Sequence, residues 1–198
     1  MTPTQTPEFI IAETRAWVER AVIGLNLCPF AKAPQVKGLV RYAVSEARDA
    51  QALLGALLEE LNGLAEAPQT RVETTLLIHP WVMNDFAAYN DFLEAAEAAV
   101  DELDLGGIIQ VASFHPHYQF ADTAADDIGN ATNRSPYPTL HLLREESIAR
   151  AVDAIEDAAA IYEANIATLR RLGAGAWDAL LQQCHEDALA AVPPPRGH

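Results

Sequence analysis

TTLLIHPW at residues 74–81 and IIQVASFHPH at residues 108–117 are the two stretches that decide the expected fold. Each is an apolar run typical of a buried strand, and each runs into a His-Pro pair. Residues 84–103 lie between them and carry apolar side chains at helical spacing. A strand–helix–strand unit of this length favours two parallel strands in one sheet.

The same patterns extend the predicted fold in both directions along the chain. Upstream we expect, in order, a helix over residues 8–27 capped by Thr6, a strand over 39–44, and a helix from Ser45 to about residue 64. Downstream we expect a fourth strand over 139–143 and helices over 146–172 and 177–191. The expected fold is therefore α/β: a small, mainly parallel sheet of three to four strands, flanked by helices, with the N-terminal and C-terminal helices packed alongside. A ferredoxin-like α+β arrangement is the alternative.

The composition is that of a folded protein of one domain. The chain has 198 residues and half of them are hydrophobic, which is enough to bury a core. We expect a single α/β domain over residues 1–192 and a loose Pro-rich tail over 193–198. The first residues lack the basic start and apolar run of a secretory signal, so we expect a cytoplasmic protein.

Charge and hydropathy exclude several classes of partner. The net charge is −15, from 28 acidic and 13 basic residues, and only two of the basic residues are lysines. Nucleic acids and anionic membranes bind clustered basic side chains, so we expect neither as a partner. No stretch approaches the roughly eighteen apolar residues that cross a membrane. The one locally basic run, Lys32, Lys37 and Arg41, suits either solubility or a small anionic molecule.

Two histidines, His79 and His115, follow the two strands. Because parallel strands end at one edge of a sheet, where α/β proteins bind ligands, we expect these imidazoles to converge there. His117 follows His115 at a spacing that lets two imidazoles share a metal. A divalent transition metal held by these three would need a further ligand, His141 or Asp122. The alternative is that each Pro simply ends its strand and each His fills the boundary.

Residues 114–138 form a long connection without periodicity, and loops of that length in compact domains are often functional. The side chains in it that suit an anionic substrate group are Asn133, Arg134, Ser135 and Tyr118. The alternative is a turn whose Asn side chains cap backbone groups, with Arg134 paired to Asp126 or Asp127.

Cys28 lies where the first predicted helix ends and is the candidate nucleophile. A thiolate forms when an imidazole or helix terminus lowers the pKa of the thiol, and any of the site histidines could serve as base. The alternative is an inert packed thiol. We therefore expect a small-molecule enzyme with metal-assisted or His/Cys acid–base chemistry, using Cys28, His79, His115 and His117. A non-catalytic metabolite-binding or regulatory module, dimeric through the 146–172 helix, is the alternative function.

Three motifs carry a resemblance to a known family. They are LCPFA at residues 27–31, FHPHYQFAD at 114–122 and NRSPYP at 133–138. Through them the chain resembles an uncharacterised bacterial family catalogued as a domain of unknown function, over roughly residues 8–172. The resemblance implies a bacterial, cytoplasmic protein. It implies no activity, so the expected site depends on the residues themselves.

Overall fold

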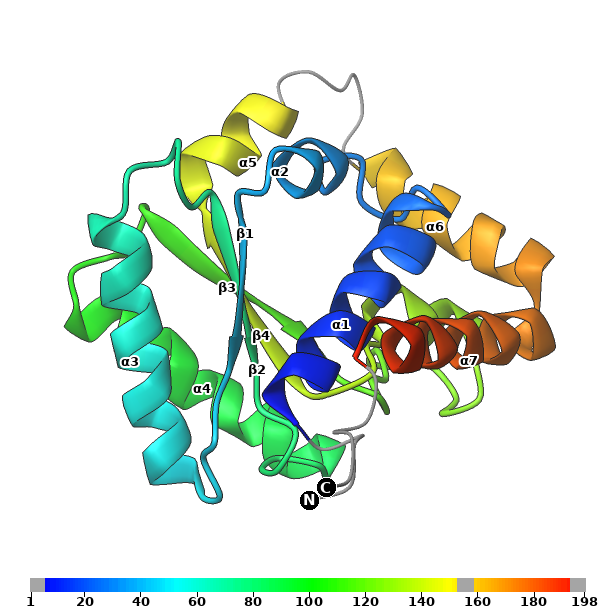
Figure 1. Ribbon diagram of the computed structural model, residues 1–198, viewed down its shortest axis with the longest axis horizontal. Helices are drawn as coiled ribbons and strands as arrows, with labels where there is room; N and C mark the ends of the chain where they lie inside the picture. Colours follow the sequence, from blue (N-terminus) through cyan, green and yellow to red (C-terminus); the bar gives the residue numbers. More distant parts are fainter. Residues whose placement is uncertain (1–5, 153–158, 193–198) are drawn as a thin grey trace, which may run out of the picture.

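A mixed four-stranded sheet forms the centre of the molecule in the computed structural model, which describes residues 6–152 and 159–192. Its strands are β1 Val40–Val44, β2 Thr74–Ile78, β3 Ile109–Phe114 and β4 Thr139–Arg144. They lie in the order β1-β2-β4-β3. Helices α3 (Ala50–Glu66) and α4 (Phe86–Glu102) cover one face, on the left in Figure 1. The chain is thus α/β, as the sequence predicts.

The expectation of a mainly parallel sheet is wrong, because β4 runs antiparallel to both of its neighbours. β3 ends at Phe114, directly opposite Thr139, the first residue of β4. The connection between these strands contains a short 3-10 helix, η3 (Ile128–Asn133), and no crossover helix, all of it within the described residues. The chain therefore stays at the same end of the sheet, so β4 runs in the direction opposite to β3. The order strand–helix–strand–helix–strand–strand also differs from that of a ferredoxin-like fold.

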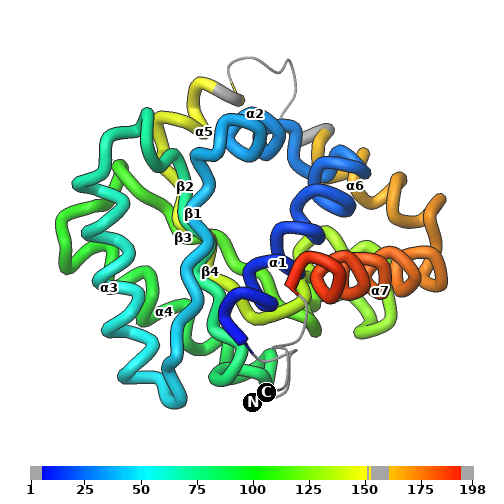
Figure 2. The backbone as a smooth tube through the Cα atoms, in the orientation of Figure 1, coloured from blue at the N-terminus to red at the C-terminus, as the bar shows by residue number. Residues whose placement is uncertain are grey.

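The second face of the sheet is covered by helices from the two ends of the chain. Helix α1 (Pro7–Trp17) continues as a π-helix, η2 (Val18–Ile23), and packs against α7 (Ala174–Ala191). Helix α6 (Ala159–Leu172) packs against η3 and α7. Figure 2 shows α1 and α7 side by side, so the first and last helices belong to the same layer.

Side-chain caps explain where several helices begin. The Thr6 hydroxyl accepts the amide hydrogen of Phe9 at 3.3 Å, which confirms the predicted start of the first helix. The expected cap at Ser45 is wrong. Helix α3 begins after Asp49, whose carboxylate accepts the Ala52 amide hydrogen at 2.8 Å. An Asp four residues further along offers the same capping oxygen as Ser, and pattern alone does not separate the two.

The expected helix over 146–172 corresponds to α5 (Glu145–Val152) and α6, and residues 153–158 lie outside the described residues. The helix expected to form a dimer is therefore described only in part. Within it, Leu169 is fully buried in this chain, whereas Tyr162 is 46% exposed. A short helix that the sequence did not predict, α2 (Lys32–Val36), follows the Cys28 turn. The expected tail, residues 193–198, also lies outside the described residues.

The alternation of side chains along the strands divides the core into two layers. Leu77, Leu140 and Leu142 belong to the cluster that α3 and α4 cover. Leu76 and Ile78 belong to the second cluster, with Ile10 and Trp17 of α1 and residues of α6 and α7. Among the helices of the described ranges, none has the length and apolar character to cross a membrane.

Candidate functional site

The two strand-end histidines lie together, but inside the protein. His79 and His115 are each 0% exposed, and their rings lie 5.7 Å and 5.1 Å from the ring of Tyr89 on α4. The Tyr89 hydroxyl donates to the Thr139 carbonyl at 2.8 Å and accepts from the Phe114 amide at 3.1 Å. We call His79, His115 and Tyr89 the buried hub. It joins α4 to the end of β3 and the start of β4.

Backbone groups occupy most ring nitrogens of the buried hub. His115 Nε2 lies 3.1 Å from the Met83 carbonyl, and its Nδ1 accepts the amide hydrogen of His117 at 3.0 Å. His79 Nδ1 lies 3.2 Å from the Val82 carbonyl. Burial lowers the pKa of His79 to about 4 and also lowers that of His115, so both rings are neutral at pH 7. Neither ring is open to a substrate or a metal ion.

The hydrogen bonds of Tyr89 lead to a stability prediction. Tyr89→Phe leaves a buried carbonyl and a half-buried amide without their partner, and we expect the unfolding free energy to fall by about 2 kcal/mol. Urea denaturation measures this loss. Tyr118→Phe is the matched control, because the Tyr118 hydroxyl has no hydrogen-bond partner among the described residues. Equal losses in the two variants would show that the Tyr89 hydroxyl is not structural.

The predicted anion-binding residues bind their own segment of chain. Asn133, Arg134 and Ser135 each donate to backbone carbonyls, at distances between 2.6 Å and 3.2 Å. The described residues include no ion pair of Arg134, so the expected alternative pairing with Asp126 or Asp127 is not formed. The Tyr118 ring packs between the rings of Phe86 and Phe120, at 5.2 Å and 5.0 Å. These groups shape the 114–138 connection.

The other members of the predicted site lie apart. His117 is exposed, with its ring 5.8 Å from that of His115, and Asp122 is also exposed. His141 faces the opposite layer of the sheet, and so does Cys28. Within residues 6–152 and 159–192, no three His, Cys, Asp or Glu side chains gather where they could hold a metal ion. The arrangement therefore does not support the expected three-histidine site.

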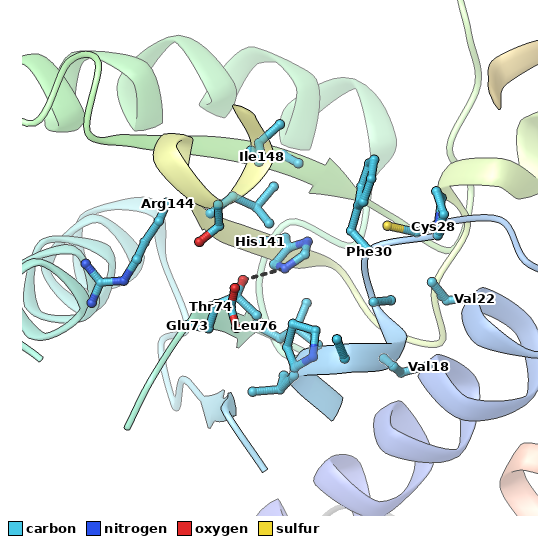
Figure 3. A pocket seen from close by; sticks show the side chains of 18 of the residues that line it. Val18, Val22, Cys28, Phe30, Glu73, Thr74, Leu76, His141, Arg144 and Ile148 are labelled. Atoms are coloured by element: carbon cyan, nitrogen blue, oxygen red, sulfur yellow. Dashed lines mark hydrogen bonds between the residues drawn. The ribbon is translucent and has the colours of Figure 1, made fainter. Parts of the chain in front are cut away.

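A cavity of about 550 Å³ brings Cys28 and His141 to a common space. It lies on the face of the sheet that carries the second core cluster, between β2, β3, β4, the end of α1, η2, the Cys28 turn and α5. Most of its lining is apolar, including Trp17, Val18, Val22, Phe30, Leu76 and Ile148. Figure 3 shows His141 between Thr74 on one side and Phe30 and Cys28 on the other.

Strand register explains why His141 faces this space. It lies near the middle of β4, where it is paired with Leu76 of β2 and with Ala112 of β3. Paired residues point to the same face, so all three side chains line the cavity. Ala112 is the smallest of them, and its short side chain leaves room beside the imidazole.

His141 binds one neighbouring side chain. Its Nε2 lies 2.7 Å from the hydroxyl oxygen of Thr74, which in turn donates to the Leu142 carbonyl at 2.6 Å. Burial lowers the pKa of His141 to about 4, so the ring is neutral at pH 7. The cavity thus has an uncharged imidazole in its wall.

Cys28 lines the cavity as an uncharged thiol. The side chain is half-buried, and burial raises its pKa, although the amide groups of Phe30 and Ala31 partly offset that shift. The expected thiolate is therefore disfavoured at neutral pH. A thiol and an imidazole that are both neutral make hydrogen bonds, whereas a catalytic ion pair needs both groups charged.

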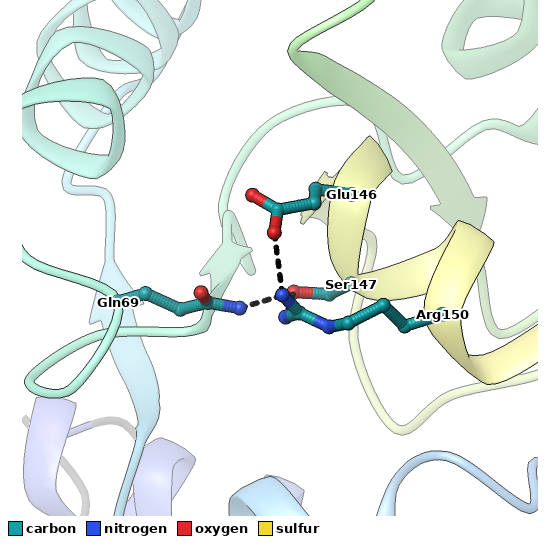
Figure 4. Close-up of polar contacts among 4 residues, drawn as sticks. All are labelled: Gln69, Glu146, Ser147 and Arg150. Carbon is teal, nitrogen blue, oxygen red and sulfur yellow. Dashed lines mark hydrogen bonds and ion pairs between the residues drawn. The ribbon is translucent and has the colours of Figure 1, made fainter.

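Charged side chains of the lining belong to the end of the cavity near α5. Arg144 lines it, but its guanidinium donates to the Leu64 and Ala67 carbonyls, each at 2.6 Å, and points away in Figure 3. Arg150 pairs with Glu146 at 2.6 Å in an exposed bridge. Figure 4 shows this pair beside the contact that joins α5 to the segment after α3, in which Gln69 donates to the Ser147 hydroxyl at 2.8 Å. Both arginines thus bind other groups of the protein, and the lining as a whole is mostly apolar.

Thr74 and Trp17 are cavity residues that the sequence did not predict. The strand pattern in Thr139–Arg144 separates Leu140 and Leu142 from His141, which signals that the histidine faces another layer. No sequence signal indicates that Thr74 is its partner, because that contact depends on β4 lying beside β2. The cavity itself arises from packing between α1, η2 and the sheet.

Comparisons with known proteins add a family but no activity. Residues 9–179 match the model of a family described as "Protein of unknown function (DUF1415)". The matched range covers most of the chain, including the three motifs quoted above. In these comparisons no curated protein and no solved structure matches the chain.

Proposed function

Because the chain belongs to the DUF1415 family of proteins of unknown function, we propose a function from the cavity alone: it binds a small, largely apolar molecule. The observation that carries the proposal is the cavity of about 550 Å³, lined mostly by apolar side chains with a few polar groups. Binding sites for small molecules have this size and composition. The scattered histidines favour this binding function over the metal-assisted enzyme.

One of the lining residues, Trp17, has a buried donor. The indole N–H of Trp17 is buried and has no hydrogen-bond partner among the described residues, and Trp17 is part of the cavity lining. A buried donor without a partner costs free energy. The nitrogen itself is closed to solvent, so the indole reports on the cavity wall and is not a contact point for a ligand.

Trp17 also gives the test. The chain has three tryptophans, each with one indole N–H signal in a ¹H–¹⁵N spectrum, and only Trp17 lines the cavity. On titration with naphthalene, we expect the Trp17 signal to shift while those of Trp81 and Trp177 stay in place. Equal shifts of all three signals, or none, would contradict binding in the cavity.

A cavity-filling variant separates specific from general binding. Ala112→Phe places a large ring beside His141, and we expect it to abolish the Trp17 shift. Ala87→Phe is the matched control, because Ala87 is exposed on α4, on the other side of the sheet. Loss of the shift in both variants would mean that the probe does not occupy this cavity.

A small-molecule enzyme that uses His/Cys chemistry is the second candidate. It is favoured by Cys28 and His141 lining one cavity, and disfavoured by the neutral state of both groups. The two functions differ in the effect of Cys28→Ser. Turnover of a bound molecule that this substitution abolishes, with binding retained, would favour the enzyme.

A further inference from the structure

The hydrogen bonds of Thr74 determine which nitrogen of His141 carries the hydrogen. The Thr74 hydroxyl lies 2.6 Å from the Leu142 carbonyl and 2.7 Å from His141 Nε2. A carbonyl oxygen can only accept, and the hydroxyl has one hydrogen, so Thr74 donates to Leu142. The hydroxyl oxygen must then accept from Nε2. His141 is therefore the Nε2–H tautomer, and its Nδ1 carries a bare lone pair.

The lone pair on Nδ1 has no partner among the described residues. The ring of His141 is half-buried, and it forms part of the cavity wall beside Thr74. Because the ring is neutral at pH 7, Nδ1 can accept a hydrogen bond but cannot donate one. The cavity therefore presents an acceptor to whatever occupies it.

The thiol of Cys28 is a second polar group of the lining, and it can donate. A hydroxyl group both donates and accepts, so it suits a cavity that offers the acceptor Nδ1 and the Cys28 donor. A carboxylate accepts only, and it would oppose the lone pair of Nδ1 and lose its hydration.

We infer that the molecule bound in this cavity is an alcohol or phenol whose hydroxyl donates its hydrogen to Nδ1 of His141. The inference rests on the proposed binding function and narrows the class of ligand. In this arrangement Thr74 is a positioning residue, because it acts on the ligand only by holding His141 in the Nε2–H tautomer. The apolar part of the ligand lies against Leu76, Phe30 and the other apolar lining residues.

A pair of probes of similar shape tests the hydroxyl. 1-Naphthol and 1-methylnaphthalene differ in a hydroxyl and a methyl group, and both are uncharged at pH 7. With the full-length protein, followed by the Trp17 indole signal, we expect the naphthol to bind about tenfold more tightly. In His141→Leu the preference is expected to disappear. His117→Leu is the matched control, because His117 is exposed outside the cavity, and it keeps the preference.

Thr74→Val tests the tautomer separately, and it also replaces His141→Leu should that variant not fold. Without the Thr74 hydroxyl, Nδ1 is free to take up the hydrogen, so the preference for 1-naphthol is expected to fall. Equal affinity of the two probes for the wild-type protein would overturn the inference and leave the proposed binding function in place. Binding of neither probe would overturn both. A preference that persists in His141→Leu would overturn the inference alone.

Discussion

Lowering the pH from 7 to 4 is expected to reduce the unfolding free energy by about 6 kcal/mol, through two histidines whose pKa values burial lowers. Burial lowers the pKa of His79 and of His141 from 6.5 to about 4. Between these values the unfolded chain binds protons that the folded chain does not. The stabilising contribution is complete above pH 6.5 and is lost as the pH falls towards 4. His115, whose pKa burial also lowers, adds to the loss.

Two substitutions measure how much of this pH dependence comes from His141 and how much from His79. His141→Gln retains a donor for Thr74, and His79→Asn retains one for the Val82 carbonyl, but neither new side chain titrates. We expect each variant to lose about half of the pH dependence in urea denaturation between pH 7 and pH 5. His117→Asn, a change at an exposed histidine, is the control and retains it. A wild-type stability that is constant over this range would refute the account.

Replacing Arg144 by Met is expected to lower the unfolding free energy by about 4 kcal/mol. The guanidinium donates to the Leu64 and Ala67 carbonyls, each at 2.6 Å, and lies 3.3 Å from the Val72 carbonyl. These carbonyls belong to the end of α3 and to the segment that leads into β2. A cation there also interacts favourably with the negative, C-terminal end of the α3 helix dipole. Met keeps the length of the side chain but leaves three carbonyls without a donor.

Arg150→Met is the matched control for Arg144→Met. Arg150 also lines the cavity, but its side chain is 52% exposed and its partner Glu146 is 76% exposed. An exposed pair of this kind on one helix contributes at most about 0.5 kcal/mol. Urea denaturation of the two variants should therefore give clearly different losses. Similar losses would mean that the bonds of Arg144 to α3 do not stabilise the fold.

The helices and strands could largely be predicted from local pattern, whereas the sheet order could not. Thr6 as a cap and the apolar stripe of α1 are local features, and both are found. The position of β4 between β2 and β3 depends on where the 114–138 connection leads the chain. That path depends on η3 and on the hydrogen bonds that Asn133 and Arg134 make to nearby backbone carbonyls. No repeating pattern of residue types in the sequence indicates these contacts.

The candidate site shows the same division between local and long-range information. His79 and His115 reach one end of the sheet, as their place after parallel strands suggests, but Tyr89 encloses them. Burial of that kind depends on α4 packing over the strand ends, and the His-Pro pairs carry no sign of it. Cys28 and His141 are both among the predicted candidates. They line one cavity because of the register in which β4 pairs with its neighbours, and that register could not be predicted from the sequence.

The central position of β4 has a consequence for how the protein is made. During synthesis β1, α3, β2, α4 and β3 all emerge before β4, yet within the sheet β4 is the strand that joins β2 to β3. The sheet therefore closes late, through contacts between distant parts of the chain, which favours slow folding. Because His141 arrives with the same strand, a nascent chain has no complete pocket, and a pocket ligand would stabilise the finished protein alone.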